Sequence, residues 1–233
     1  MEEVILTAAL LVGAMHVLAF GESRANKRKT GVIVTDIQGD FTEAKAGSLA
    51  VGGTDQTFID RVEKATSKLN RKGCLIFATQ DWHPPDHISF YTSHPGKKAF
   101  ETVQIHGRTQ VLWPPHCVQG TENAKVLLDS KLFQAIVKKG KNKNFESYSG
   151  FKDDGGAETE MDQLLKEHGI RELIIYGIAT DYCVKATAVD AADFGYQVTV
   201  IESLCKGVTP ETTARALQEM KERGIKVEKE LRD

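Results

Sequence analysis

The chain has 233 residues, a formal net charge of −2, 41% hydrophobic residues and 27% charged residues. These values are typical of a globular protein. They exclude a charge-driven disordered chain and a strongly basic domain that binds nucleic-acid phosphates by bulk electrostatics. The length favours one large domain. The four cysteines are too few and too scattered for a disulfide scaffold, and no two are spaced as Cys-x-x-Cys.

The N-terminal segment contains the only long apolar run of the chain. This run covers residues 4–20 and is a little short for a bilayer span. Ala19 and Gly21 are small residues at the two positions that a signal peptidase reads. Residues 1–21 are therefore a candidate signal peptide, which predicts an exported protein.

A second interpretation of this segment is an upstream start codon that adds non-native residues. Glu2 and Glu3 support it, because a signal peptide normally begins with basic residues. Under this interpretation the protein is cytoplasmic. Both interpretations treat the polar stretch 22–29 as a linker and predict a folded domain over residues 30–233.

The rest of the chain repeats a pattern of apolar strand, amphipathic helix and glycine. A β-rich run over 31–36 precedes a helix whose apolar positions over 58–69 follow the 3.6-residue period. Glycine then separates a helix from an apolar strand four times, as expected at helix C-termini. The strands that follow these glycines are predicted at 74–78, 173–176, 198–201 and 225–227. Such units predict an α/β fold with a mostly parallel central sheet and helices on both faces.

The segment from residue 81 to residue 131 interrupts this pattern. It contains several proline turns and no clear periodicity, so we expect an elaborated loop region. Long loops in compact domains are usually functional.

Reactive residues follow four predicted strands. Asp36 ends the first strand, residues 80–83 end the second, Lys139 follows a short strand over 134–137, and residues 177–183 follow the strand over 173–176. Ligands of open α/β sheets bind beyond the carboxyl ends of the strands. The sequence therefore predicts that an acid, a metal-ligand pair, a lysine and a cysteine meet at one edge.

Cys183 is the candidate nucleophile. We expect Thr180 to cap a helix whose first turn holds Cys183, where the helix dipole favours the thiolate. Asp36 is then the candidate general base and Lys139 a charge-stabilising group, while N–H groups around Ala179 and Cys183 are a candidate oxyanion hole. The alternative is that Cys183 is a small buried residue without chemistry.

Histidines and a carboxylate indicate a metal site near the second strand. Asp81 and His83 are two positions apart, so in an extended segment their side chains point to the same side. His87 and His116 lie in the proline-rich loops. Such ligands suit one divalent ion, Zn²⁺, Fe²⁺ or Mn²⁺, with a coordination position left open. The alternative for His87 and His116 is hydrogen bonding to loop backbone.

Long motifs in this chain resemble the nicotinamidases of the isochorismatase-like cysteine hydrolase superfamily, whose fold is a Rossmann-like three-layer sandwich. The resemblance runs in order from about Thr30 to Val227. The motifs that carry it are residues 34–41, 79–90, 112–121, 139–140, 147–151 and 177–184.

The resemblance implies a role for individual residues. Asp36, Lys139 and Cys183 match the family's catalytic triad, and Lys139 is preferred to Lys138 because the family's lysine directly precedes glycine. The implied metal ligands are Asp81, His83, His116 and, in some members only, His87. The implied substrate-binding positions are Phe41, Trp113, Tyr148 and Ala179.

The implied reaction is hydrolysis of nicotinamide, or of pyrazinamide, to the acid and ammonia through a cysteine thioester, in NAD salvage. The family also has a cis peptide bond at the position of Ile178–Ala179. These expectations concern a small-molecule substrate and one divalent metal ion, and the sequence is compatible with a homo-oligomer.

Two other functions compete with this interpretation. A related hydrolase with the same triad acts on isochorismate or a carbamoyl amine, but Asp81, His83 and His116 favour a nicotinamidase. A non-enzymatic module that binds a metal or a partner has no need for a group that generates a thiolate. Nucleic-acid binding has no support from the charge balance.

Overall fold

The computed structural model describes residues 29–232. The candidate signal peptide and residues 22–28 of the predicted linker lie outside the described residues. Strand β1 (Lys29–Thr35) already includes Lys29, so the strand begins one residue before the domain start predicted from the sequence. Within residues 29–232, no helix has the length and apolar character needed to cross a membrane.

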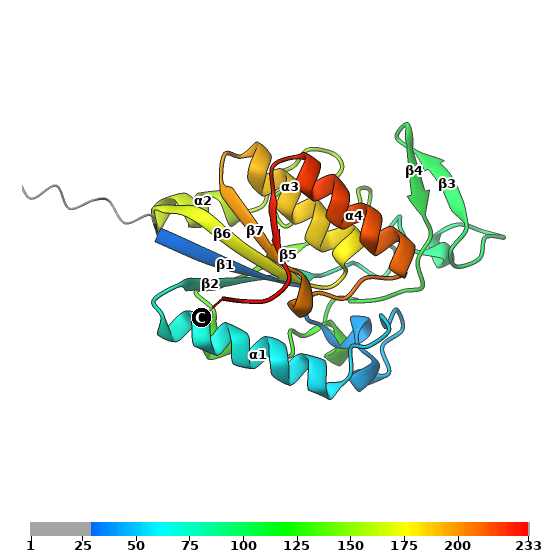
Figure 1. Ribbon diagram of the computed structural model, residues 1–233. Coiled ribbons are helices and arrows are strands. Elements are labelled where there is room, and N and C mark those ends of the chain that lie inside the picture. The colour runs from blue at the N-terminus through cyan, green and yellow to red at the C-terminus, as the bar shows by residue number, and fades with distance from the viewer. Residues whose placement is uncertain (1–28, 233) are drawn as a thin grey trace, which may run out of the picture.

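A six-stranded parallel sheet forms the centre of the domain (Figure 1). Its strand order is β5-β2-β1-β6-β7-β8, and every neighbouring pair is parallel. The other five strands are β2 (Leu75–Asp81), β5 (Ala135–Lys139), β6 (Ile170–Gly177), β7 (Gln197–Ile201) and β8 (Lys226–Glu228). The parallel sheet predicted from the repeated glycine junctions is therefore confirmed.

Helices cover both faces of the sheet, as predicted. Helix α1 (Gln56–Arg71) lies on one face, and three helices lie on the other (Figure 1). These three are α2 (Met161–Glu167), α3 (Lys185–Asp193) and α4 (Pro210–Glu222). The result is a three-layer α/β sandwich.

Local sequence signals account for the ends of these helices. The Asp55 side chain accepts a 2.9 Å hydrogen bond from the Phe58 N–H at the start of α1. Thr209 caps α4 in the same way, as its position before Pro210 predicts. Gly73 follows α1 with φ +88°, a left-handed conformation that favours glycine.

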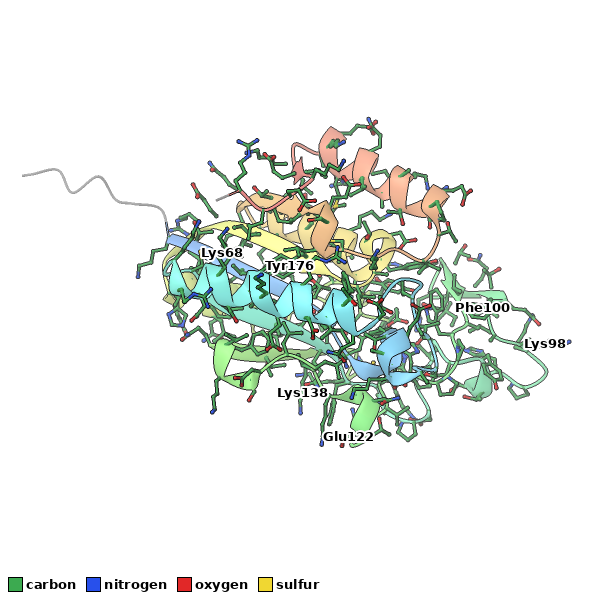
Figure 2. All side chains as sticks on the ribbon, turned by 60° about the horizontal axis from the view of Figure 1, so that its bottom comes forward. Lys68, Lys98, Phe100, Glu122, Lys138 and Tyr176 are labelled. Atoms are coloured by element: carbon green, nitrogen blue, oxygen red, sulfur yellow. The ribbon has the colours of Figure 1, made fainter. Side chains whose placement is uncertain are left out.

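The hydrophobic core lies between the sheet and the two helical layers. Residues 32–34 of β1 are fully buried because helices cover the central strand on both faces. Phe58, Val62 and Leu69 of α1 pack against this core. The buried Tyr176 side chain of β6 lies near α1 (Figure 2), and its hydroxyl is 2.7 Å from Thr66 Oγ1. This bond ties the helix to the sheet.

The segment between β2 and β5 contains a hairpin that the sequence analysis missed. Strands β3 (Thr102–Ile105) and β4 (Arg108–Val111) pair in antiparallel fashion. The joining residues His106 and Gly107 both have positive φ, 51° and 75°, as a two-residue hairpin turn requires. The strands are short and partly exposed, so their apolar alternation is weak. The hairpin projects from one end of the sheet (Figure 1).

Candidate active site

Four reactive side chains meet at one end of the sheet. Strand order changes direction between β1 and β6, and ligands of open α/β sheets bind at such a point. Asp36 directly follows β1, Asp81 ends β2, Lys139 ends β5, and Cys183 lies in the turn after β6. All four side chains are buried. The structure therefore brings together residues that are distant in the sequence, as the strand ends predicted.

The Lys139 ammonium group is enclosed by acceptors. Its Nζ lies 2.9 Å from Asp36 Oδ2 and 2.5 Å from Asp81 Oδ1, and it donates to the Ser147 carbonyl at 2.9 Å. It also lies 3.5 Å from Cys183 Sγ. Burial alone would lower the pKa of Lys139, but the two carboxylates outweigh it and raise this pKa well above its ordinary value. The group is therefore a permanent positive charge beside the sulfur.

The neighbouring Lys138 has a different environment. Its Nζ lies 4.0 Å above the centre of the Trp82 ring, at the surface (Figure 2). Successive side chains of a strand point to opposite faces, so only one of the two lysines can enter the site. The structure places Lys139 there, the lysine that precedes glycine.

Thr79 holds the carboxylate oxygen of Asp36 that Lys139 does not contact. Thr79 Oγ1 donates to Asp36 Oδ1 at 2.6 Å. Asp36 has φ +47°, a left-handed conformation that aspartate tolerates better than most residues. Burial raises the pKa of Asp36, and the Lys139 ammonium only partly opposes this shift. Asp36 is therefore a stronger base than an exposed aspartate.

Cys183 lies in a π-helical turn, Thr180–Val184, that leads into α3. The prediction that Thr180 caps this helix is wrong. Ala179 occupies the N-cap position, no side chain caps the turn, and the Thr180 N–H donates to the Lys206 carbonyl at 2.9 Å. The strand-to-helix connection, which the sequence does not specify, decides this arrangement.

The resting state of Cys183 also differs from the expectation of a helix-stabilised thiolate. Burial raises the pKa of the Cys183 thiol well above its ordinary value, and the attraction of Lys139 only partly opposes it. Cys183 Sγ and carboxylate oxygens of Asp36 and Asp81 all lie within 4.8 Å of one another. The thiol is therefore protonated at rest, with a basic carboxylate within reach of its proton.

The peptide bond between Ile178 and Ala179 is cis. Ala179 lines the same cavity as Cys183. Its backbone N–H has no acceptor within residues 29–232. A free N–H beside a nucleophile is a suitable donor to a developing oxyanion.

Asp81, His83 and His116 form a buried cluster beside this site. One ligand atom from each lies within 4.8 Å of the others. His83 Nε2 lies 3.4 Å from Asp81 Oδ2 and, as a buried polar atom, has no hydrogen-bond partner within the described part of the chain. Burial alone would raise the pKa of Asp81, but Lys139 and then His83 hold it well below its usual range. An ionised carboxylate and an orphaned ring nitrogen fit a divalent cation.

Backbone carbonyls orient both histidines for this role. His83 Nδ1 donates to the Gly140 carbonyl at 3.1 Å, and His116 Nδ1 donates to the Pro114 carbonyl at 2.7 Å. Metal-bound histidines typically donate their second ring N–H in this way. Burial, followed by the nearby His83, lowers the pKa of His116 to about 4, so its ring is neutral at neutral pH. Nε2 of His116 therefore keeps a free lone pair.

His87 is not brought into the Asp81, His83 and His116 cluster. Its ring lies 4.2 Å from the His83 ring, but Ser89 Oγ lies 2.7 Å from Nδ1 and the Phe145 carbonyl lies 3.1 Å from Nε2. Because the carbonyl can only accept, Nε2 donates and Nδ1 is left to accept. Both ring nitrogens therefore have partners, one of them the loop backbone, and the role of His87 as a metal ligand stays a prediction.

No sequence pattern indicated Glu146, which lines the cavity and also lies close to His83 and His87. Its carboxylate is buried and lies within 4.8 Å of ring nitrogens of His83 and His87. Burial alone would raise the pKa of Glu146, but these two histidines lower it. Its place directly before the Ser147–Tyr148 motif is not by itself a signal for a role in the site.

A cavity of about 430 Å³ opens beside Cys183. Phe41, Trp113 and Tyr148 line it, as the resemblance implied, and Trp113 Nε1 donates to the Tyr148 hydroxyl at 3.1 Å. Tyr182 is a further aromatic residue that lines the cavity, and no sequence pattern indicated it. Its ring centre lies 5.1 Å from that of Trp113 in an edge-to-face arrangement. A flat ring fits among these side chains.

Gln38 anchors the backbone of Asp81 and was also missed. Its Oε1 accepts from the Asp81 N–H at 2.8 Å, and its Nε2 donates to the Asp81 carbonyl at 2.9 Å. Beyond the end of β1, the Gln38 side chain thus makes the hydrogen bonds to the Asp81 backbone that a neighbouring strand would otherwise make. Gln38 lies only two residues after Asp36, but hydrophobic periodicity does not indicate a role for a polar residue at this position.

Gly140 allows the His83 ring to approach the end of β5. It has φ +67°, and an added Cβ would lie 2.4 Å from His83 Cε1 and 2.5 Å from His83 Nδ1. A methyl group cannot be accommodated at these distances unless the ring moves. The close approach of the His83 ring therefore explains why glycine follows Lys139.

We expect Gly140→Ala to lower metal affinity about 10–100-fold, the usual effect of disturbing the partner of a metal-binding histidine. The metal content of the variant after dialysis, measured by elemental mass spectrometry, tests this expectation. The matched control is Gly169→Ala, because Gly169 has φ +68° but open space around its added Cβ. Equal metal loss in both variants would show that backbone strain, and not the His83 contact, is responsible.

The isochorismatase domain family model matches residues 30–229. A nicotinamidase of Escherichia coli is 40% identical over 198 residues, which cover 83% of this chain and 91% of that protein. The chain belongs to the nicotinamidases of the isochorismatase family. Members of this group are hydrolases that act on amide carbon–nitrogen bonds, and this chain is such a hydrolase.

Solved structures agree with this assignment. A yeast nicotinamidase bound to the inhibitor nicotinaldehyde superposes with a TM-score of 0.80 at 32% identity, covering 85% of this chain and 98% of that chain. A pyrazinamidase of Pyrococcus horikoshii in complex with zinc gives a TM-score of 0.72 at 38% identity, covering 86% of this chain and 98% of that chain.

Proposed function

We propose that this chain hydrolyses nicotinamide to nicotinate and ammonia through a thioester on Cys183, with one divalent metal ion bound at Asp81, His83 and His116. The single observation that carries the proposal is the meeting of a buried thiol, a basic carboxylate and a fixed ammonium group beside an aromatic-lined cavity. Relatives that are named nicotinamidases supply the substrate class.

The first step forms the thioester. Asp36 accepts the thiol proton, and Cys183 Sγ attacks the carboxamide carbon. Lys139 stabilises the negative charge that passes between sulfur and carboxylate, since its Nζ lies 3.5 Å from Sγ and 2.9 Å from Asp36 Oδ2. The N–H groups of Ala179 and Cys183 are assigned to the oxyanion.

The thioester forms when the carbon–nitrogen bond breaks. The protonated Asp36 returns its proton to the amide nitrogen, and ammonia leaves. A water molecule then attacks the thioester carbonyl, again with Asp36 as the base, and nicotinate leaves as the thiol is restored. Covalent catalysis divides the hydrolysis of an unreactive amide into two easier steps.

The metal-ligand cluster adjoins the cavity: Asp81 and His116 line it, and the His116 ring centre lies 5.3 Å from that of Phe41. When bound, a divalent ion supplies a Lewis-acidic partner for the ring nitrogen of a pyridine. Asp81, His83 and His116 would hold it, and Phe41, Trp113 and Tyr148 would enclose the ring. Zn²⁺, Fe²⁺ and Mn²⁺ all suit this set of one carboxylate and two imidazoles.

Ammonia release from nicotinamide tests the proposal. We expect release by the purified chain, loss of release after dialysis against a chelator, and recovery when Zn²⁺, Fe²⁺ or Mn²⁺ is added back. Metal content is measured in parallel on each sample, with pyrazinamide as a second substrate. Full activity in protein shown to be free of metal would contradict the metal part of the proposal.

A further inference from the structure

Two large apolar side chains are exposed within residues 29–232, and both lie at the mouth of the active-site cavity. Phe100 is 63% exposed and Val208 is 47% exposed. Both line the cavity that contains Cys183, although they come from distant parts of the chain. Single exposed apolar residues are common on protein surfaces. Convergence of both on one catalytic cavity instead points to an apolar part of a ligand.

The backbone of Phe100 is held in an unusual conformation. Its φ is +69°, and bulky residues adopt this left-handed region only where their surroundings impose it, often at ligand sites. Its N–H donates to the Leu112 carbonyl at 2.6 Å. Its ring packs edge-to-face on Trp113, with centres 6.2 Å apart. The side chain lies at the end of the molecule from which the hairpin β3–β4 projects (Figure 2).

Val208 is held relative to the nucleophile. Its N–H lies 3.1 and 3.2 Å from the two carboxylate oxygens of Asp181. Asp181 belongs to the same helical turn as Cys183 and also accepts a hydrogen bond from the Thr212 hydroxyl. The backbone of Val208 is therefore held against the turn that carries the thiol.

The cavity is larger than the substrate of the proposed function needs. Its volume of about 430 Å³ falls within the range of roughly 300–1,000 Å³ that holds drug-sized ligands, and a monocyclic carboxamide is much smaller. The charged groups, Asp81 and Glu146, lie with Cys183 in its interior, whereas Phe100 and Val208 form an apolar mouth. Space and apolar surface thus remain beyond the ring.

We propose that Phe100 and Val208 are specificity-determining residues that bind an apolar ring substituent, so that the chain also hydrolyses alkyl-substituted pyridine carboxamides. This inference rests on the proposed function. The amide carbon–nitrogen bond breaks, water supplies the hydroxyl of the acid and the hydrogen taken by ammonia, and the substituent is unchanged.

The test compares kcat/KM for ammonia release from nicotinamide and from nicotinamides with a butyl chain at the ring carbon meta or para to the carboxamide. We expect the wild type to hydrolyse at least one butyl isomer with kcat/KM within about tenfold of that for nicotinamide. Phe100→Ser and Val208→Ser should each lower kcat/KM for that isomer about tenfold and for nicotinamide less than about threefold, while Phe100→Leu should retain it. Thermal unfolding of each variant checks the fold.

Two results would overturn this inference and leave the proposed function standing. The first is a wild type that hydrolyses nicotinamide but neither butyl isomer. The second is an equal loss of kcat/KM for both kinds of substrate in the serine variants. Failure of the wild type to release ammonia from nicotinamide would instead overturn the proposed function, and the inference with it.

Discussion

Replacement of Cys183 by alanine should lower ammonia release from nicotinamide by at least about a thousandfold, since no other group can form the acyl intermediate. The variant should fold, because Cys183 is a small side chain at the edge of the cavity. Within the described residues the other buried thiols belong to Cys117 and Cys205, outside the lining of this cavity. Neither thiol can replace Cys183.

Intact-protein mass spectrometry separates a thioester from direct attack by water. Acid quenching of the wild type during turnover should trap a nicotinoyl adduct that is absent from Cys183→Ala. Cys205→Ala is the matched control, because Cys205 is buried and its Sγ donates to the Ile201 carbonyl at 3.2 Å. We expect it to keep both activity and adduct. An active Cys183→Ala variant would remove the thioester from the mechanism.

Replacement of Asp36 by asparagine should lower kcat/KM about 10²–10⁴-fold, the usual contribution of a general base. The amide keeps the shape of the carboxylate but cannot accept the thiol proton. Lys139 retains its ion pair with Asp81 in this variant, so the fold should persist. Circular dichroism and metal content check that the loss is catalytic.

The same residue predicts the acid side of the pH profile. Asp36 must be ionised to accept a proton, so activity falls as pH drops through its pKa. Burial raises the pKa of Asp36, so this fall should begin at a higher pH than for an exposed aspartate, whose pKa is about 3.9. kcat/KM is measured across the acid range, with metal content determined at each pH. A fall that only follows metal loss would contradict the assignment to Asp36.

Much of the fold could be predicted because its signals are local. The apolar period of residues 58–69 and the glycine after each helix depend on neighbouring residues alone, and both appear as expected. The hairpin β3–β4 was missed because its strands are short and half-exposed, with little apolar alternation. The Thr180 cap failed because the connection from β6 places Ala179, and not Thr180, at the N-cap position, so that Thr180 is already the first residue of the turn.

The candidate site also has a part that the sequence predicts and a part that only the tertiary structure shows. Asp36, Asp81, Lys139 and Cys183 were placed at one edge from strand ends and from a family resemblance, and their catalytic roles remain proposals. The sequence could not show that Lys139 pairs with both carboxylates, because that pairing requires β5, β2 and β1 to be adjacent. The same adjacency brings Glu146 to the histidines, while Gln38 reaches the Asp81 backbone from beyond β1.

The sequence by itself therefore determined the βα pattern, the class of fold and the kinds of side chain that end each strand. Only the tertiary structure decided which of those side chains are partners, that His87 bonds to Phe145 and Ser89, and that Phe100 and Val208 share one cavity mouth. The physical reason is range. Helix periodicity and capping act between residues a few positions apart, whereas hydrogen bonds and ion pairs in the site depend on strand order and on crossovers between distant segments.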